Sequence, residues 1–147
     1  MGTVVESFLT SAQEQRVIEA IRLAEKQTSG EIRVHIESYT GEDIFKHAQE
    51  VFHLLKMDNT KEGNGVILYV AVNLKKFVIY GDTGINKLVG ADFWNSTRDL
   101  IQQQFKQGKF DQGLINGIQE IGRVLKQYFP WDSNDENELP NEISKPS

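Results

Sequence analysis

The chain has 147 residues, no cysteine and a formal net charge of −5. This length is enough for one domain with its own core, and the lack of cysteine excludes disulfides, thiolate zinc sites and thiol nucleophiles. The acidic residues are concentrated in residues 131–147, and neither this tail nor the nearly neutral body has the basic surface that nucleic-acid binding requires.

Neither a membrane segment nor a signal peptide is predicted. No apolar run approaches the roughly 20 residues of a membrane helix, and the N-terminal residues lack the basic and then apolar pattern of a signal peptide. We therefore expect a cytoplasmic monomer that does not insert into membranes.

The first predicted element is an amphipathic helix. Ser11 and Glu14 have the spacing of a capping box at its start. Gly30, suited to a positive φ, marks its end. Residues 31–37 then alternate strictly between apolar and polar side chains, which predicts a strand with one polar or partly covered face near a sheet edge. We expect His35, on that polar face, to be a paired surface histidine.

A second helix is predicted from Ile44 to Leu55, with Thr40 or Asp43 as its cap. His47 and His53 lie outside its apolar stripe and six residues apart, so they do not share a face for metal binding. We expect both histidines to be solvated.

The middle of the chain predicts a β-hairpin. Residues 66–72 are an almost unbroken apolar run, which is typical of a central strand covered on both faces. Residues 77–80 form a second run rich in β-branched and aromatic side chains, after a polar turn. We expect the core to rest on this hairpin.

Two further helices are predicted in the last third of the chain. Residues 85–91 are expected to be irregular, and Asp92 to cap a helix that runs to about Phe105. Asp111 is expected to cap the last helix, which Pro130 stops. The tail that follows is too polar and acidic to order itself.

These elements predict an α/β fold, in which about four helices form a three-layer α/β/α sandwich around a small mixed sheet of three to four strands. A strand–helix–strand crossover usually gives parallel strands, whereas a hairpin is antiparallel. We predict one domain over residues 1–130, followed by an acidic and disordered tail over 131–147.

The topology predicts where a site would lie. If the first two strands are parallel, their starts and the end of the third strand meet at one edge of the sheet. Oxygen-bearing side chains there suit a hard cation, Ca²⁺ or alternatively Mg²⁺. The candidate ligands are Glu31, Asn64, Asp82 and Asp92, and the Thr28 and Ser29 hydroxyls are weaker candidates. Alternatively, Asn64 and Asp82 are only turn formers and Asp92 only a helix cap.

Several segments resemble the TPM domain, a family named partly after a thylakoid lumen protein linked to photosystem II repair. They are Thr28–Val34, Asn64–Leu68, Gly81–Asn86 and Asp92–Trp94, in that order and spacing. The resemblance is to the short, stand-alone bacterial type and covers about residues 8–130. It implies an α/β/α sandwich with a divalent-metal site, usually discussed as calcium, on loops at one sheet edge. A plant member has been described as an acid phosphatase.

Three functional hypotheses follow. The first is a non-enzymatic domain that binds calcium or magnesium and serves as an adaptor in protein or envelope maintenance. The second, which comes mainly from the resemblance, is a metal-dependent acid phosphatase-like hydrolase, in which the ion activates water. The third is a protein-interaction module that uses the acidic tail for contact. The catalytic residues, the protein partner and the choice between the two cations are not fixed by the sequence.

Overall fold

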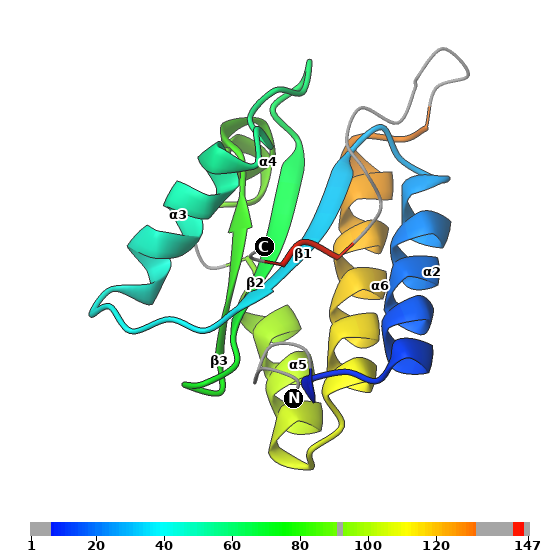
Figure 1. Cartoon of the computed structure of the whole chain (residues 1–147). Coiled ribbons are helices and arrows are strands. Elements are labelled where there is room, and N and C mark those ends of the chain that lie inside the picture. The colour runs from blue at the N-terminus through cyan, green and yellow to red at the C-terminus, as the bar shows by residue number, and fades with distance from the viewer. Residues whose placement is uncertain (1–6, 91–92, 132–142, 146–147) are drawn as a thin grey trace.

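A mixed three-stranded sheet lies between two layers of helices (Figure 1). This computed structural model describes residues 7–90, 93–131 and 143–145. Strands β1 (Glu31–Glu37) and β2 (Gly65–Ala71) are parallel, and β3 (Lys76–Gly81) is antiparallel to β2. The predicted α/β fold with a small mixed sheet is therefore confirmed.

The helices pack on both faces of this sheet. Their bounds are α2 (Ser11–Glu25), α3 (Ile44–Leu54), α4 (Thr83–Val89), α5 (Asn95–Lys106) and α6 (Phe110–Tyr128). Helix α3 covers one face, whereas α2 and α6 lie on the other (Figure 1). Within the described ranges, no helix is both long and apolar enough to cross a membrane.

Strand β2 is the centre of the core, and all seven of its residues are buried. Val66, Leu68 and Val70 belong to the apolar cluster that includes residues of α2 and α6. Ile67 and Tyr69 belong to the second cluster, with residues of α3. Because successive side chains of a strand point to opposite faces, an unbroken apolar run is what this two-sided burial requires.

Residues 85–91 were expected to be irregular, and this prediction is wrong because most of them form α4. Asp82 is the N-cap of this helix, and its side chain accepts a hydrogen bond from the Thr83 amide. The helix is held against the sheet by Ile85, which is fully buried. A cap and one buried apolar side chain thus order a segment too short to show helical periodicity.

Three predicted helix boundaries also need correction. The capping box is formed by Thr10 and Gln13, one position earlier than expected. Helix α5 begins at Asn95 with Trp94 at the N-cap position, so Asp92 is not its cap. Asp111 lies inside α6, where its carboxylate pairs with Arg16 at 2.8 Å instead of capping the helix.

Gly30 does not adopt the expected positive φ, because α2 ends at Glu25. Gly30 is instead a point of close packing. A Cβ atom there would lie 2.9 Å from the Leu125 side chain and 3.2 Å from the Asn64 carbonyl oxygen. The missing side chain therefore lets α6 approach the start of β1.

A segment near the C-terminus lies against the sheet. Residues 143–145 lie along β1, and Ser144 forms a parallel bridge with His35. Ile143 and Ser144 are both buried. The expectation of a disordered tail is therefore wrong for these three residues.

The close approach of two loops predicts the cost of one substitution. A Cβ atom on Gly84 would overlap the carbonyl oxygen of Glu62 and lie 2.5 Å from that of Gly63. Backbone atoms cannot rotate away as a side chain can, so we expect Gly84→Ala to destabilise the fold by about 3 kcal/mol in urea denaturation, the upper end of the usual cost of overpacking.

The control for this substitution is Gly90→Ala. Gly90 has open space around it, but its φ is +79°. We expect a smaller loss of about 1–2 kcal/mol, the cost of a left-handed conformation. Equal losses for the two variants would contradict the packing argument.

Candidate functional site

The three predicted segments meet at one edge of the sheet. Glu31 at the start of β1 is opposite Gly65 at the start of β2, and the end of β3 lies beside them because Val66 is opposite Gly81. The Asp82 amide donates to the Gly65 carbonyl at 2.9 Å. The convergence predicted from the topology is therefore confirmed in the backbone.

Three of the four candidate ligands are buried at this edge. The exposed fractions are 3% for Glu31, 2% for Asn64 and 7% for Asp82. Asp92, the fourth candidate, lies outside the described residues. Two acidic residues and one asparagine, from the start of β1 and from the positions just before β2 and just after β3, are thus buried where these backbone segments meet.

Asp82 already has a structural role at this edge. One of its carboxylate oxygens, Oδ1, accepts a hydrogen bond of 2.7 Å from the Thr83 amide, as an N-cap does. Its charge also acts beyond α4, because burial and then the Asp82 carboxylate raise the pKa of Tyr80. The capping role that the sequence left open is therefore present, and a cation would bind in addition to it.

Asn64 is part of a small polar cluster with Ser29 and Glu62. The Asn64 side-chain amide donates to Ser29 Oγ at 3.3 Å and to Glu62 Oε2 at 3.2 Å. Ser29 Oγ donates to the same carboxylate oxygen at 3.0 Å. This geometry brings Glu62, an exposed residue, to the site. Glu62 was not among the predicted site residues, and the one signal for it was a carboxylate two residues before the predicted ligand Asn64.

The glycines at this edge are accounted for by backbone packing. Gly63 has a φ of +60°, and its carbonyl accepts a hydrogen bond of 3.1 Å from the Ile85 amide. Gly84 lies directly against the same loop. Their small size therefore joins two loops and is not by itself evidence of a ligand.

The edge offers oxygen donors of the kind that hard cations prefer. However, among the described residues no three His, Cys, Asp or Glu side chains are grouped so that they could hold a metal ion. The described part of this edge thus contains two buried acidic residues, Glu31 and Asp82, and the buried Asn64, which is hydrogen-bonded to the exposed Glu62. Any further donors would have to come from Asp92, from backbone carbonyls or from water.

A second polar cluster lies farther along β1, between the sheet and α3. His35 Nε2 and His47 Nε2 each lie 2.6 Å from a different oxygen of the Glu37 carboxylate. The Tyr69 hydroxyl donates to Glu37 at 2.8 Å. His35 is paired, as expected, but it is buried instead of lying on the surface. His47 was expected to be solvated and is instead partly covered, whereas His53 is exposed as expected.

Burial and hydrogen bonding act in opposite directions in this cluster. Burial lowers the pKa of His35 despite its hydrogen bond to Glu37. For Glu37, burial alone would raise the pKa, but the hydrogen bonds from His35, Tyr69 and His47 outweigh it, so the pKa is lowered. Burial and the bond to Glu37 raise the pKa of Tyr69. Glu37 is therefore a partly buried carboxylate held by hydrogen bonds from three side chains.

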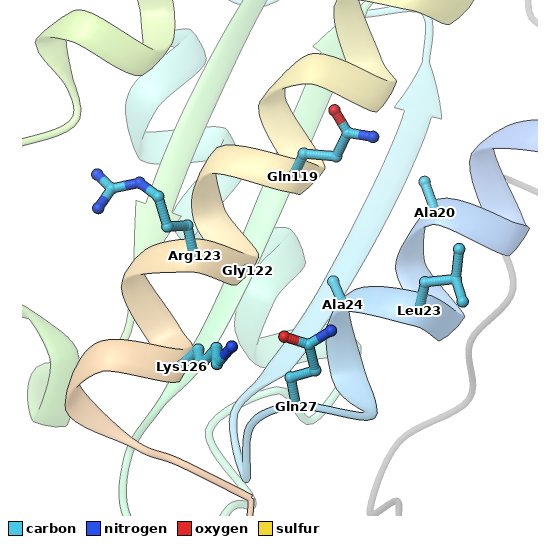
Figure 2. A pocket seen from close by; sticks show the side chains of 8 residues that line it. All are labelled: Ala20, Leu23, Ala24, Gln27, Gln119, Gly122, Arg123 and Lys126. Carbon is cyan, nitrogen blue, oxygen red and sulfur yellow. The ribbon is translucent and has the colours of Figure 1, made fainter.

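A groove between α2 and α6 lies apart from both clusters (Figure 2). It is lined by aliphatic, amide-bearing and basic side chains and by one glycine: Ala20, Leu23, Ala24, Gln27, Gln119, Gly122, Arg123 and Lys126. Arg123 is held by Glu120, with a shortest N–O distance of 2.6 Å. A Cβ atom on Gly122 would lie 2.8 Å from Ala24, so the groove marks the close contact of the two helices.

The comparisons with known proteins agree with this architecture. The TPM domain model matches residues 3–124, which is most of the chain. The chain belongs to the TPM domain family. One solved relative is the BA42 protein of the psychrophilic bacterium Bizionia argentinensis, determined by NMR. It is 58% identical with a TM-score of 0.90, and the match covers 97% of this chain and 98% of that one.

A second solved structure with a similar fold is the N-terminal domain of a protein from P. gingivalis, also determined by NMR. It is 18% identical with a TM-score of 0.70, and the match covers 84% of this chain and 80% of that one. At this identity the likeness concerns the fold alone. No match was found among curated proteins.

The buried histidine predicts a pH dependence of stability in this TPM domain. The pKa of His35 is lowered in the folded state, whereas an unfolded histidine titrates near about 6.5. The unfolded chain therefore binds the proton first as the pH falls, and stability decreases from about pH 6.5 down to the folded pKa. The decrease for one such group is at most about 1.4 kcal/mol per pH unit.

We expect His35→Gln to flatten this decrease in urea denaturation between about pH 6.5 and 5. The groups that act on His35 are Glu37, Arg33 and His47. Glu37, with its lowered pKa, contributes stability that is lost only at lower pH, below about 4.3. The matched control is His53→Gln, an exposed histidine beside Asp58. If both variants change the slope equally, burial of His35 is not the cause.

Proposed function

We propose that this TPM domain binds a divalent cation, Ca²⁺ or Mg²⁺, at the sheet edge where β1 and β2 begin. The observation that carries the proposal is the burial of Glu31, Asn64 and Asp82 at one edge of the sheet. These residues come from three segments of the chain and meet through strand pairing. The proposed ligands are Glu31, Asn64, Asp82 and Asp92.

Electrostatics favours a cation at such an edge. Removing a carboxylate from water is costly unless an opposite charge or hydrogen bonds compensate it. Asp82 has one such bond, to the Thr83 amide. Glu31 also has an interaction within the protein, and a cation bound at this edge would add to these contacts in a place where solvent screens charges weakly.

The number of side-chain donors affects which cation fits. Calcium accepts six to eight oxygens, including backbone carbonyls and water, at variable geometry. Magnesium requires a near-octahedral arrangement and keeps several waters. Few acidic side chains are available here, so water and backbone oxygens would complete either shell. We propose cation binding without catalysis, in a domain that acts as an adaptor.

The test is a titration with CaCl₂, repeated with MgCl₂, followed by backbone amide chemical shifts. We expect the amide chemical shifts that change on cation addition to cluster at residues 29–31, 63–65 and 81–86. We expect Glu31→Gln and Asp82→Asn each to weaken binding at least about tenfold, since each removes one charge from the site. Shifts confined to residues 131–147 would contradict the proposal, because they would indicate only counterions on the acidic tail.

Asp82→Asn separates the effect of charge from that of folding. Asparagine is as good an N-cap as aspartate, so Asp82→Asn preserves the start of α4 while removing the charge. The matched control is Asp99→Asn, which removes an exposed carboxylate on α5 and should leave the affinity unchanged. Equal effects of Asp82→Asn and Asp99→Asn would mean that the domain responds only to its net charge.

A further inference from the structure

The outer edge of β1 is occupied by the C-terminal residues Ile143–Lys145, which we call the C-terminal clip. The Ser144 amide donates to the Val34 carbonyl at 2.8 Å, and the Ile36 amide donates to the Ser144 carbonyl at 3.0 Å. The clip runs parallel to β1. It therefore satisfies backbone groups that an outermost strand would otherwise leave unpaired.

Two side chains anchor the clip on either side of this bridge. Ile143 is buried in the apolar cluster that also includes residues of α2 and α6. Lys145 Nζ lies 2.6 Å from a carboxylate oxygen of Glu14, in the first turn of α2. The edge thus recognises an extended segment with an apolar, a small and a basic residue in succession.

These contacts are few and easily reproduced. Between described residues they comprise two backbone hydrogen bonds, one apolar side chain and one partly exposed ion pair. Backbone hydrogen bonds to a sheet edge do not depend on which chain supplies the strand, and strand addition is a common mode of peptide recognition. Any extended peptide with the same three-residue pattern can make the same contacts.

We propose that the β1 edge is a strand-receiving site for an extended segment of a partner protein. The segment lies parallel to β1 and carries a branched apolar residue, a small residue and then a lysine or arginine. The C-terminal clip is the internal competitor that a partner must displace. This proposal is independent of cation binding, because it concerns the outer edge at Val34–Ile36 and not the start of the strand.

Competition by a tethered segment has a measurable consequence. A short tether holds its segment at an effective concentration in the millimolar range, so a free peptide binds the intact chain more weakly than a chain whose clip is detached. We expect the affinity difference to be at least about tenfold.

The experiment uses the full chain with Ser144→Pro as the opened variant. Proline has no N–H, so the bond to Val34 is lost. The probe is a fluorescent peptide with the sequence of residues 140–147, PNEISKPS. We expect anisotropy to report at least about tenfold tighter binding to Ser144→Pro than to the natural chain, with amide shifts at Val34–Ile36.

Two controls test the recognition. A peptide with proline in place of its serine should not bind, because it cannot donate to Val34. Glu14→Lys, added to Ser144→Pro, should weaken binding of the natural peptide, and a peptide with glutamate in place of its lysine should restore it. If the peptide bound elsewhere, the glutamate peptide would not restore binding to the Glu14→Lys variant.

Two results would overturn the proposal. The first is a folded Ser144→Pro chain, with natural amide shifts in β2 and β3, in which the peptide leaves β1 unchanged. The same result in a chain truncated before residue 140 would exclude residual blocking by the clip. The second is a natural chain that sediments as a dimer and becomes a monomer on Ser144→Pro, because the occupant would then be the clip of a second copy.

Discussion

The burial of β2 on both faces is the constraint on which the rest of this structure depends. An entirely buried strand requires an apolar layer above and below it, and α3 on one side with α2 and α6 on the other provide these layers. Because α3 connects β1 to β2 as a crossover, the two strands run parallel and begin at the same edge of the sheet. The polar edge is thus a geometric consequence of how the core is covered.

The loops at that edge are fixed by backbone contact before any ligand is considered. Gly63 and Gly84 bring the loop before β2 against the start of α4. Asp82 caps that helix and Asn64 is held by Ser29 and Glu62. Polar groups in this arrangement are already oriented, so binding would require little conformational ordering.

The strands, their pairing and the convergence of Glu31, Asn64 and Asp82 could be predicted from the sequence, because apolar periodicity and crossover rules determine them. Helix α4 could not, since it is one short segment whose order depends on the buried Ile85. The burial of His35 also escaped prediction. It depends on packing against α3 and on Ser144, which is more than a hundred residues away in the sequence. The local alternation of residues 31–37 cannot indicate such distant contacts.

The cluster around Glu37 also bears on how reliably this chain finds its strand pairing. His35 and Glu37 lie on the face of β1 where Tyr69 and His47 provide hydrogen bonds, while Val34 and Ile36 face the aliphatic cluster. A slip of β1 by one residue would exchange these faces. It would place a histidine and a carboxylate among aliphatic side chains without partners, so the polar side chains select one register from those that the backbone alone would allow.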